Sequence, residues 1–296
     1  MIVKTLILSV LLSAAFASFV SAGSLVRFRT VLGDTIVELY DIEKPITTSN
    51  FLAYVRSDRY ANMFSHRLIS DFVIQGGGFR VSHRGTSSNS VESVPSLPNI
   101  TNEFSKGPLY RNLYGTLSMA KLGGDPNSAS SQWFLSFGDN SANLDTQNGG
   151  FTVFGRVVSD TNVFNRLNTF TTSRRATNVI VNAQGAFSEL PQITYPIDQA
   201  QSLTTEQLFA NLLYIDISEL PPITLPLPNP RSASLTFGTV PGLTQRLEAS
   251  SFLMGPWQVL SDLMGTGGSL TVPDPAGIGA NRFYRLLLPP SLPRPL

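Results

Sequence analysis

The sequence predicts a mainly β protein in two parts, an antiparallel sheet closed into a barrel with two helices over its open ends, followed by a small β-sandwich-like domain. Short stretches that alternate apolar and polar residues recur between turns rich in Gly, Asn, Asp and Ser, and two stretches have helical spacing instead. Proline is unevenly placed, since 7 of the 20 prolines precede residue 221 and 13 lie from residue 221 onward. A chain of 296 residues has room for about two domains.

The first elements are predicted from periodicity. Residues 26–31 and 35–40 alternate around Gly33-Asp34, which indicates a β-hairpin turning at these two residues. Residues 46–58 place apolar side chains at helical spacing, with Thr47 or Thr48 as the N-cap. A second helix is predicted over 161–170. Further short strands are predicted at residues 117–120, 132–136 and 152–157.

Residues 1–22 have the pattern of a signal peptide. Lys4 supplies the positive start, residues 5–20 are apolar, and Val20-Ser21-Ala22 carries small residues where signal peptidase cleaves. We therefore expect cleavage after Ala22 and an exported mature protein with no membrane segment. This protein is expected in the periplasm, on the cell surface or outside the cell. Retention of this stretch as an N-terminal anchor is the alternative.

Composition excludes several kinds of chemistry. The 21 basic and 20 acidic residues leave a net charge of +1, too little to attract nucleic acid. The chain has no cysteine, so it has no disulfide, thiolate metal site or cysteine nucleophile. With His66 and His83 as its two histidines, it cannot build a multi-histidine metal centre. The sequence therefore predicts chemistry that needs neither metal nor thiol.

A proline-rich stretch divides the chain. Residues 221–230 contain five prolines and favour an extended polyproline II linker. We expect a domain at 23–220, the linker at 221–230, a small β domain at 231–289 and a proline-rich tail at 290–296. The alternative is that the stretch wraps the surface of one domain.

The regions on either side of this stretch have their own predicted elements. A short helix is expected near 205–211, and residues 212–217 are expected to form the last barrel strand. Five short strands are predicted beyond the stretch: residues 233–240, 245–251, 257–263, 269–272 and 282–288. Two interpretations stay open for Trp257, Phe283 and Tyr284, which either form the core of this module or contact glycan or the cell surface.

Several motifs follow one another in a fixed order. Residues 64–79 read FSHRLISDFVIQGGGF, 115–120 read GTLSMA, and 130–135 read SSQWFL; Leu144-Asp145 and the segment FTVFGRV at 151–157 complete the series. In residue type, order and spacing, these motifs resemble the cyclophilins, the barrel-shaped peptidyl-prolyl cis-trans isomerases. The resemblance covers about residues 25–220, and together with the leader it points to an exported bacterial member.

The resemblance implies a closed eight-stranded barrel and an enzyme that binds proline-containing peptides, speeding the folding of other exported proteins. It implies no cofactor and no metal. Rotation about an X-Pro amide takes about 20 kcal/mol, and no nucleophile is required. The twisted amide loses resonance, so its nitrogen gains a lone pair that a donor can bind. An arginine can bind it there and not in the planar ground state.

Motif positions carry the predicted site. The catalytic residues are expected to be Arg67, the donor to the prolyl nitrogen, and Gln75, which grips the peptide backbone. The residues expected to bind substrate are Phe72, Met119, Ala120, Gln132, Phe134, Leu144 and Phe151. Phe72, Met119 and Phe134 also suit plain core positions, and Arg67 also suits a surface charge or a structural ion pair. His66 is interpreted as a structural residue because no proton transfer is needed, and His83 as a solvated loop residue.

Three positions depart from the family pattern. Asn143 stands where many members have Trp, and Phe151 stands where they have His, so altered peptide preference and doubtful binding of the family's cyclic-peptide inhibitor are expected. Lys121 follows Ala120 where Asn is frequent and adds a charge near the groove. A different class of function also stays open, in which the barrel holds a partner without catalysis. The combination of Arg67, Phe72, Gln75 and Phe134 favours the enzyme, because a pure binder does not need the donor.

Overall fold

The computed structural model describes most of the chain outside its ends and several loops. The described residues are 23–86, 88–159, 161–172, 178–193, 205–221, 234–252, 255–275 and 283–287. The predicted signal peptide, almost all of the proline-rich stretch and the proline-rich tail lie outside them. Within the described part, no helix is both long and apolar enough to cross a membrane.

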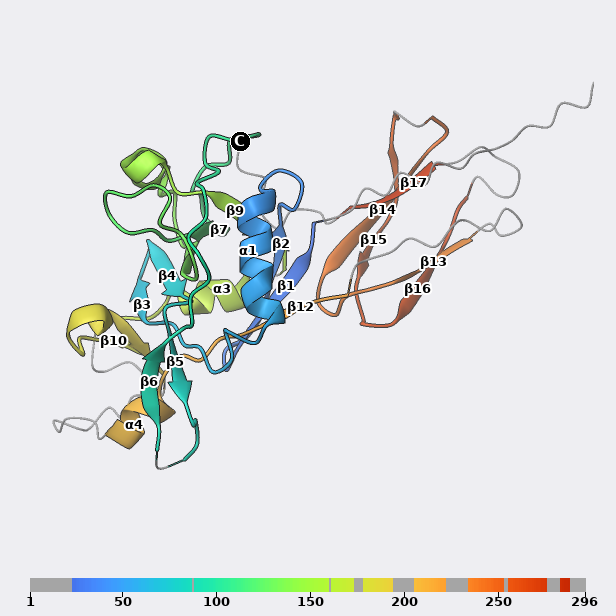
Figure 1. Cartoon of the computed structure of the whole chain (residues 1–296). Helices are drawn as coiled ribbons and strands as arrows, with labels where there is room; N and C mark the ends of the chain where they lie inside the picture. Colours follow the sequence, from blue (N-terminus) through green and yellow to red (C-terminus); the bar gives the residue numbers. More distant parts are fainter. Residues whose placement is uncertain are drawn as a thin grey trace, which may run out of the picture.

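The main body is a strongly curved antiparallel sheet of eight strands in the order β12-β1-β2-β9-β7-β8-β4-β3 (Figure 1). The strands are β1 (Leu25–Thr30), β2 (Gly33–Leu39), β3 (Arg67–Ile69), β4 (Val73–Gly76), β7 (Thr116–Met119), β8 (Trp133–Ser136), β9 (Val153–Val157) and β12 (Asp216–Glu219). The strands predicted at 117–120, 132–136 and 152–157 are confirmed as β7, β8 and β9.

The two edges of this sheet approach each other without forming a ladder. The segments just before β3 and β12 share the isolated bridge of Phe64 with Tyr214. In addition, Ser65 N donates to Leu213 O at 2.9 Å and Ile215 N to Met63 O at 3.0 Å. The last strand therefore starts at Asp216 rather than at the predicted residue 212, because residues 213–215 bond to this edge instead of to β1 and Leu212 bridges to Gln192. Full closure into a barrel stays a prediction.

The β1–β2 hairpin turns two residues earlier than predicted. Val31 and Leu32 form the turn, and Val31 is 71% exposed, while Gly33 already pairs with Thr30. Gly33 has a φ of +123°, and a Cβ there would lie 2.8 Å from Val163 Cγ2. Glycine therefore serves the return strand rather than the turn, because the helix that carries Val163, α3 (Asn162–Leu167), packs too closely for a side chain.

Two helices cover the sheet as predicted: α1 (Pro45–Arg56) and α3 (Asn162–Leu167). The expected N-cap of α1 is wrong, since the helix begins after Lys44 with Pro45 in its first turn. Its free N–H groups are satisfied from a distance, because Glu103 Oε2 accepts hydrogen bonds from Thr47 N at 2.8 Å and Thr47 Oγ1 at 2.7 Å. The short helices are α2 (Ser141–Leu144), α4 (Thr205–Ala210), and the 3₁₀ turns η1 (Gln147–Gly149) and η2 (Gly185–Phe187).

The core lies between the sheet and its covering helices. Trp133 on β8 is fully buried at its centre, and its ring meets Phe28 of β1 edge to face at 5.0 Å. The rings of Phe51 on α1 and Phe154 on β9 lie 5.3 Å apart in the same core. Inward residues of β7 and β8 fill this core, which leaves their outward residues for a second surface.

Two hairpins extend from the sheet: β5 (Phe79–Ser82) with β6 (Ser90–Ser93), and β10 (Val179–Val181) with β11 (Leu190–Gln192). They share a separate apolar cluster with the edge segments, built around the buried Phe64, Val81, Leu190 and Leu212. This cluster attaches residues 179–192 to the edge of the sheet at β3.

All five predicted C-terminal strands are present: β13 (Ser234–Gly238), β14 (Thr244–Ser250), β15 (Gln258–Met264), β16 (Ser269–Pro273) and β17 (Phe283–Leu287). They form the pair β13-β16 and the sheet β15-β14-β17, which share an apolar core of Leu235, Phe237, Leu247, Val272 and Leu286. Tyr284 packs against this core and Trp257 lies under the Arg285 guanidinium at 4.4 Å, so both aromatic rings have partners within the module.

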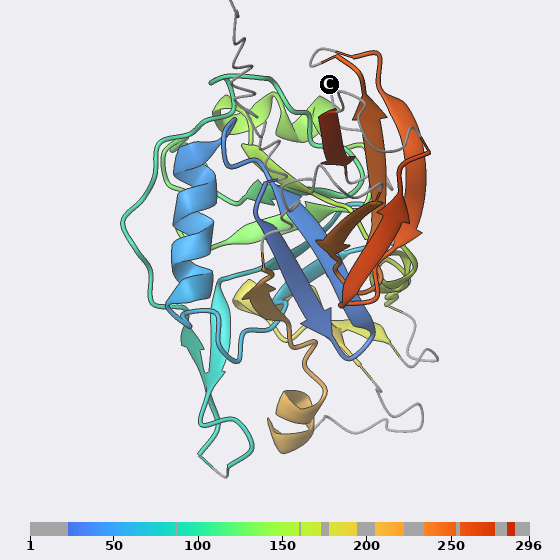
Figure 2. The same cartoon turned by 90° about the vertical axis from the view of Figure 1, so that its right-hand side faces the viewer.

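The C-terminal strands lie beside β1 and β2 (Figure 2). Val240 and Leu243, between β13 and β14, form one buried apolar cluster with Leu25, Ile36 and Val158 of the main sheet. This contact is on the β1–β2 side of the molecule, whereas β3 and β4 lie on the other side (Figure 1).

Candidate active site

The hairpin of β3 and β4 brings together the two predicted catalytic residues. Arg67 and Gln75 are directly opposite each other in the antiparallel register. The hairpin turns at Ser70-Asp71, where Asp71 has a φ of +60° and Phe72 N donates to Ile69 O at 3.1 Å. Asn168 holds this turn through Asp71 N at 2.7 Å. The two side chains therefore project from the same face of a short, anchored hairpin.

Gln75 is oriented by the next strand. Gln75 lies opposite Phe134 on β8, and its Nε2 donates to Gln132 Oε1 at 2.7 Å. The predicted peptide-contacting Gln132 thus lies beside the predicted catalytic Gln75. A glutamine held at one end presents its remaining amide groups in a fixed direction, which suits binding to a peptide backbone.

Arg67 is held by a residue that sequence analysis missed. Its Nε donates to Glu189 Oε2 at 2.6 Å, and the two side chains are 35% and 34% exposed. Glu189 lies between η2 and β11, 122 residues after Arg67 in the chain. No motif contains it, so a sequence pattern had no signal for this contact.

An apolar floor lies next to these polar groups. Val73, Phe134 and Leu144 form a buried cluster, and Phe72, Ala120 and Phe151 pack against it. The structure therefore brings together five of the predicted substrate-binding residues with Val73, which sequence analysis missed. The alternation of β4 was a usable signal for Val73, because residues 73 and 75 share a face.

Met119 is the exception among the predicted substrate-binding residues. It is 1% exposed and belongs to the main core, opposite Trp133 in the β7–β8 ladder. Phe134 pairs instead with Ser118. Because neighbouring residues of a strand point to opposite faces, Met119 and Trp133 fill the core while Phe134 faces the floor. The prediction of Met119 as a groove wall is therefore corrected to a core position.

The floor is closed at one end by the loop that carries Phe151. Phe151 N donates to Leu144 O at 2.9 Å, and Asn112 Nδ2 donates to Phe151 O at 3.0 Å. Lys121 Nζ donates to Asn148 O at 2.7 Å and Gly150 O at 2.6 Å, and lies 4.7 Å from the centre of the Phe151 ring. Burial lowers the pKa of Lys121 to about 8. Lys121 thus fixes the loop rather than extending into solvent.

His66 has the structural environment that the sequence suggested. It is buried beside Arg67, and its ring meets Phe79 edge to face at 5.2 Å. Burial, with the nearby Arg67 charge, lowers the pKa of His66 to about 4, so the imidazole is neutral at pH 7. Its Nδ1 is buried without a hydrogen-bond partner. His83 lies in an exposed loop.

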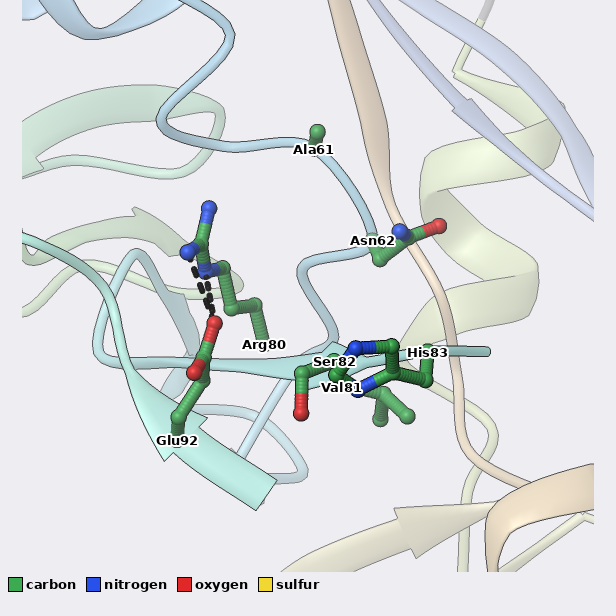
Figure 3. A pocket seen from close by; sticks show the side chains of 7 residues that line it. All are labelled: Ala61, Asn62, Arg80, Val81, Ser82, His83 and Glu92. Atoms are coloured by element: carbon green, nitrogen blue, oxygen red, sulfur yellow. Dashed lines mark hydrogen bonds and ion pairs between the residues drawn. The ribbon is translucent and has the colours of Figure 1, made fainter. Parts of the chain in front are cut away.

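A cavity of about 350 Å³ lies apart from these residues, at the β5–β6 hairpin (Figure 3). It is lined by Ala61, Asn62, Arg80, Val81, Ser82, His83 and Glu92. Arg80 and Glu92 are joined to each other in its lining, where Arg80 Nε donates to Glu92 Oε1 at 2.7 Å. None of the predicted site residues lines this cavity. In the part of the chain that the structure describes, no group of three His, Asp or Glu side chains is placed to hold a metal ion.

The site is thus an apolar floor in which Val73, Phe134 and Leu144 are buried and Phe72, Ala120 and Phe151 are partly exposed. An arginine and a glutamine on the curved antiparallel sheet flank it, with no nucleophile and base in contact among the residues just described. Its lining combines an apolar contact surface with two hydrogen-bonding side chains. Comparisons with known proteins name the family. The family model described as "Cyclophilin type peptidyl-prolyl cis-trans isomerase/CLD" matches residues 25–184.

Individual relatives agree with this match. A peptidyl-prolyl cis-trans isomerase of Acinetobacter baylyi is 37% identical over 153 residues, covering 51% of this chain and 76% of the relative. One from Streptomyces antibioticus is 41% identical over 144 residues, covering 47% and 80%. A cyclophilin-type isomerase of Cryptosporidium parvum, solved in the presence of the dipeptide Ala-Pro, has 25% identity and a TM-score of 0.42 over 67% of this chain and 99% of its own.

The chain therefore belongs to the cyclophilin-type peptidyl-prolyl cis-trans isomerases. Its activity is the cis-trans isomerisation of X-Pro peptide bonds, which confirms the enzyme over the non-catalytic alternative. The matched region ends at residue 184, so Glu189 and the five C-terminal strands lie beyond it.

Proposed function

We propose that Arg67 is the catalytic residue of this isomerase and that the floor around Phe134 holds the proline ring. The observation that carries the proposal is the register of Arg67 opposite Gln75, next to the cluster of Val73, Phe134 and Leu144. A proline-containing peptide lying on this floor would have its X-Pro bond within the span of the two polar side chains. Gln75, held by Gln132, would grip the peptide backbone.

The chemistry follows from the amide. The planar X-Pro bond is stabilised by resonance, and its nitrogen accepts no hydrogen bond. As the bond twists, the nitrogen becomes pyramidal and its lone pair can accept a hydrogen bond from a donor. A guanidinium is always protonated and can donate a hydrogen bond to this lone pair. Because the planar amide nitrogen offers no such lone pair, the guanidinium stabilises the twisted state and not the ground state. A rate gain of about five decades would require roughly 7 kcal/mol of such differential binding.

A peptide assay tests the role of Arg67. The isomerisation rate of a short Ala-Pro-Phe peptide is measured for the protein and for Arg67→Ala, after circular dichroism shows that both are folded. Arg56→Ala is the matched control, because Arg56 is also ion-paired through Nε, to Glu219 at 2.7 Å, but lies on α1 away from the floor. Loss of most acceleration in Arg67→Ala alone supports the proposal, and full activity in Arg67→Ala contradicts it.

The cellular role is part of the same proposal. We propose a bacterial enzyme that is exported through the leader at residues 1–22 and assists the folding of other exported proteins in the periplasm or outside the cell. The leader pattern supports export, and the proline-containing substrates follow from the activity. Cell fractionation and N-terminal sequencing of the mature protein test it. A first residue of Gly23 is expected, and an uncleaved cytoplasmic protein would contradict export.

The division into domains at 23–220 and 231–289 is also proposed. The five C-terminal strands have an apolar core of their own, which supports a separate module. We further propose that this module contacts glycan or the cell surface. Binding to isolated cell envelopes is compared for the protein with and without residues 222–296. Equal binding by both proteins would contradict it.

A further inference from the structure

We propose that Glu189 is a positioning residue for Arg67. This inference rests on the proposed role of Arg67. Glu189 Oε2 accepts the Nε–H of Arg67 at 2.6 Å, and among the described residues this is the one hydrogen bond that the Arg67 side chain makes. The two terminal amino groups of the guanidinium are therefore left for a ligand. A contact through Nε fixes the plane of the guanidinium without occupying the end that would meet the substrate.

Glu189 is itself well anchored. Its carbonyl oxygen accepts a hydrogen bond from Leu68 N at 2.8 Å, so its backbone is joined to β3 one residue from Arg67. The following residue, Leu190, is buried with Phe64 and Val81. Phe187, two residues earlier, packs its ring 4.8 Å from that of Phe79. A carboxylate held from both sides in this way can hold a long, flexible side chain in place.

This contact is made by a residue outside the part of the chain that the family model matches. The family model ends at residue 184, five positions before Glu189. The segment from η2 through β11 thus adds to the matched region a carboxylate placed directly on the proposed donor. Arg67 and its cross-strand neighbour Gln75 are then both held by partners from other segments, Glu189 and Gln132 respectively.

Positioning of this kind has a distinct kinetic signature. Arg67 is proposed to act on the twisted amide and not on the bound ground state. If Arg67 is free to rotate, the productive geometry is populated less often, and kcat falls while KM changes little. A merely structural role for Glu189 would instead loosen the groove and raise KM or lower the melting temperature.

Two variants test this inference. Glu189→Ala removes the acceptor and is expected to lower kcat about tenfold with KM within about twofold. Glu189→Gln keeps an oxygen that can accept from Nε, so it is expected to retain most of the activity. Glu219→Ala and Glu219→Gln are matched controls, because Glu219 accepts from Arg56 Nε at 2.7 Å on β12, away from the floor, and both should leave kcat and KM unchanged.

The outcomes separate this inference from the proposal it rests on. If Arg67→Ala is inactive while Glu189→Ala has parental kcat, the positioning role is wrong and the role of Arg67 stands. If Arg67→Ala is fully active, the proposed role of Arg67 is wrong, and the positioning role of Glu189 is wrong with it. In an Arg67→Ala background, adding Glu189→Ala should cause no further loss. A further loss would show that Glu189 acts elsewhere.

A spectroscopic measurement covers the case in which Glu189→Ala does not fold. The Nε–Hε resonance of Arg67, assigned by its disappearance in Arg67→Lys, should exchange slowly with solvent in the parent protein and shift in Glu189→Gln. Identical resonances in the parent and Glu189→Gln would overturn the inference, because the contact would not exist in solution.

Discussion

The rings of Phe134 and Phe151 meet edge to face, with centroids 5.8 Å apart and planes at 70°. Phe134 comes from β8, and Phe151 comes from the loop that Lys121 ties down. This pair belongs with Leu144 to the apolar cluster of the site, and Phe134 is the cross-strand neighbour of Gln75, which in turn lies opposite Arg67. The shape of the floor therefore depends on contacts between separate segments, which the following predictions probe.

Phe134→Leu should reduce kcat/KM about tenfold, because a smaller side chain leaves part of the proline ring without a contact surface. The loss of folding stability should be only about 1 kcal/mol, since the volume change is small. Phe137→Leu is the matched control, with a buried ring in the main core, and should lose similar stability without losing kcat/KM. Peptide isomerisation and urea unfolding measure the two effects. Equal activity losses in both variants would contradict a binding role for Phe134.

Lys121 should give the protein a stability that rises with pH in the alkaline range. Burial holds the pKa of Lys121 near 8, below its ordinary 10.5, so between these values the unfolded chain binds more protons than the folded one. The free energy of unfolding therefore increases as pH rises from about 8 to 10.5. Urea unfolding at pH 7, 9 and 10 should show this slope in the parent and a flatter one in Lys121→Met. Parallel slopes would contradict the assignment.

His66 should cause a loss of stability on acidification. Its pKa is about 4 in the folded protein against an ordinary 6.5, so the folded state resists protonation. Stability is lost as pH falls from 6.5 towards 4, by an amount on the order of 3 kcal/mol. His66→Gln should flatten the curve, whereas the exposed His83→Gln should not. Isomerase activity should stay level between pH 6.5 and 8, since neutral His66 transfers no proton. A steep activity change in that range would contradict this.

Leu243→Asp should detach the C-terminal strands from the main sheet without affecting catalysis. Leu243 is fully buried against Leu25, Ile36 and Val158, so a carboxylate there would lose its hydration. The site lies on β3, β4 and β8, on the other side of the sheet. Faster proteolysis between residues 222 and 233 is expected, with unchanged kcat/KM. Met264→Asp, at a 60% exposed residue, is the control and should match the parent in both measurements. Loss of activity in Leu243→Asp would show that the two parts are coupled.

Much of the site could be predicted from local patterns. Arg67, Phe72 and Gln75 lie within one continuous motif, so the hairpin that the motif forms places them without help from distant parts. The strands around Gln132 and Phe134 were equally readable, because alternation and turn residues are local properties. The same holds for the five C-terminal strands, whose bounds differ from the predicted ones by at most two residues.

Other features depended on chain segments far apart in sequence. The Gly33-Asp34 turn was predicted wrongly because the packing of Val163 on Gly33 is a tertiary contact. Met119 was assigned to the wrong face because the motif does not state which neighbour in a strand faces the core. The cap of α1 was missed because Glu103 is 56 residues away from Thr47.

By itself, the sequence determined the β1–β2 strands, β7 to β9, the C-terminal strands, the two covering helices, the family motifs and the residue types of the site, since these rest on periodicity and short-range spacing. The hairpins β5–β6 and β10–β11 were not predicted. The tertiary structure alone decided that Glu189 contacts Arg67, that Val73 joins the floor in place of Met119, and that Val240 and Leu243 pack on the main sheet. The physical reason is that a side-chain contact between distant segments depends on the whole folding topology. Neither partner's neighbours in sequence carry a pattern that specifies the other.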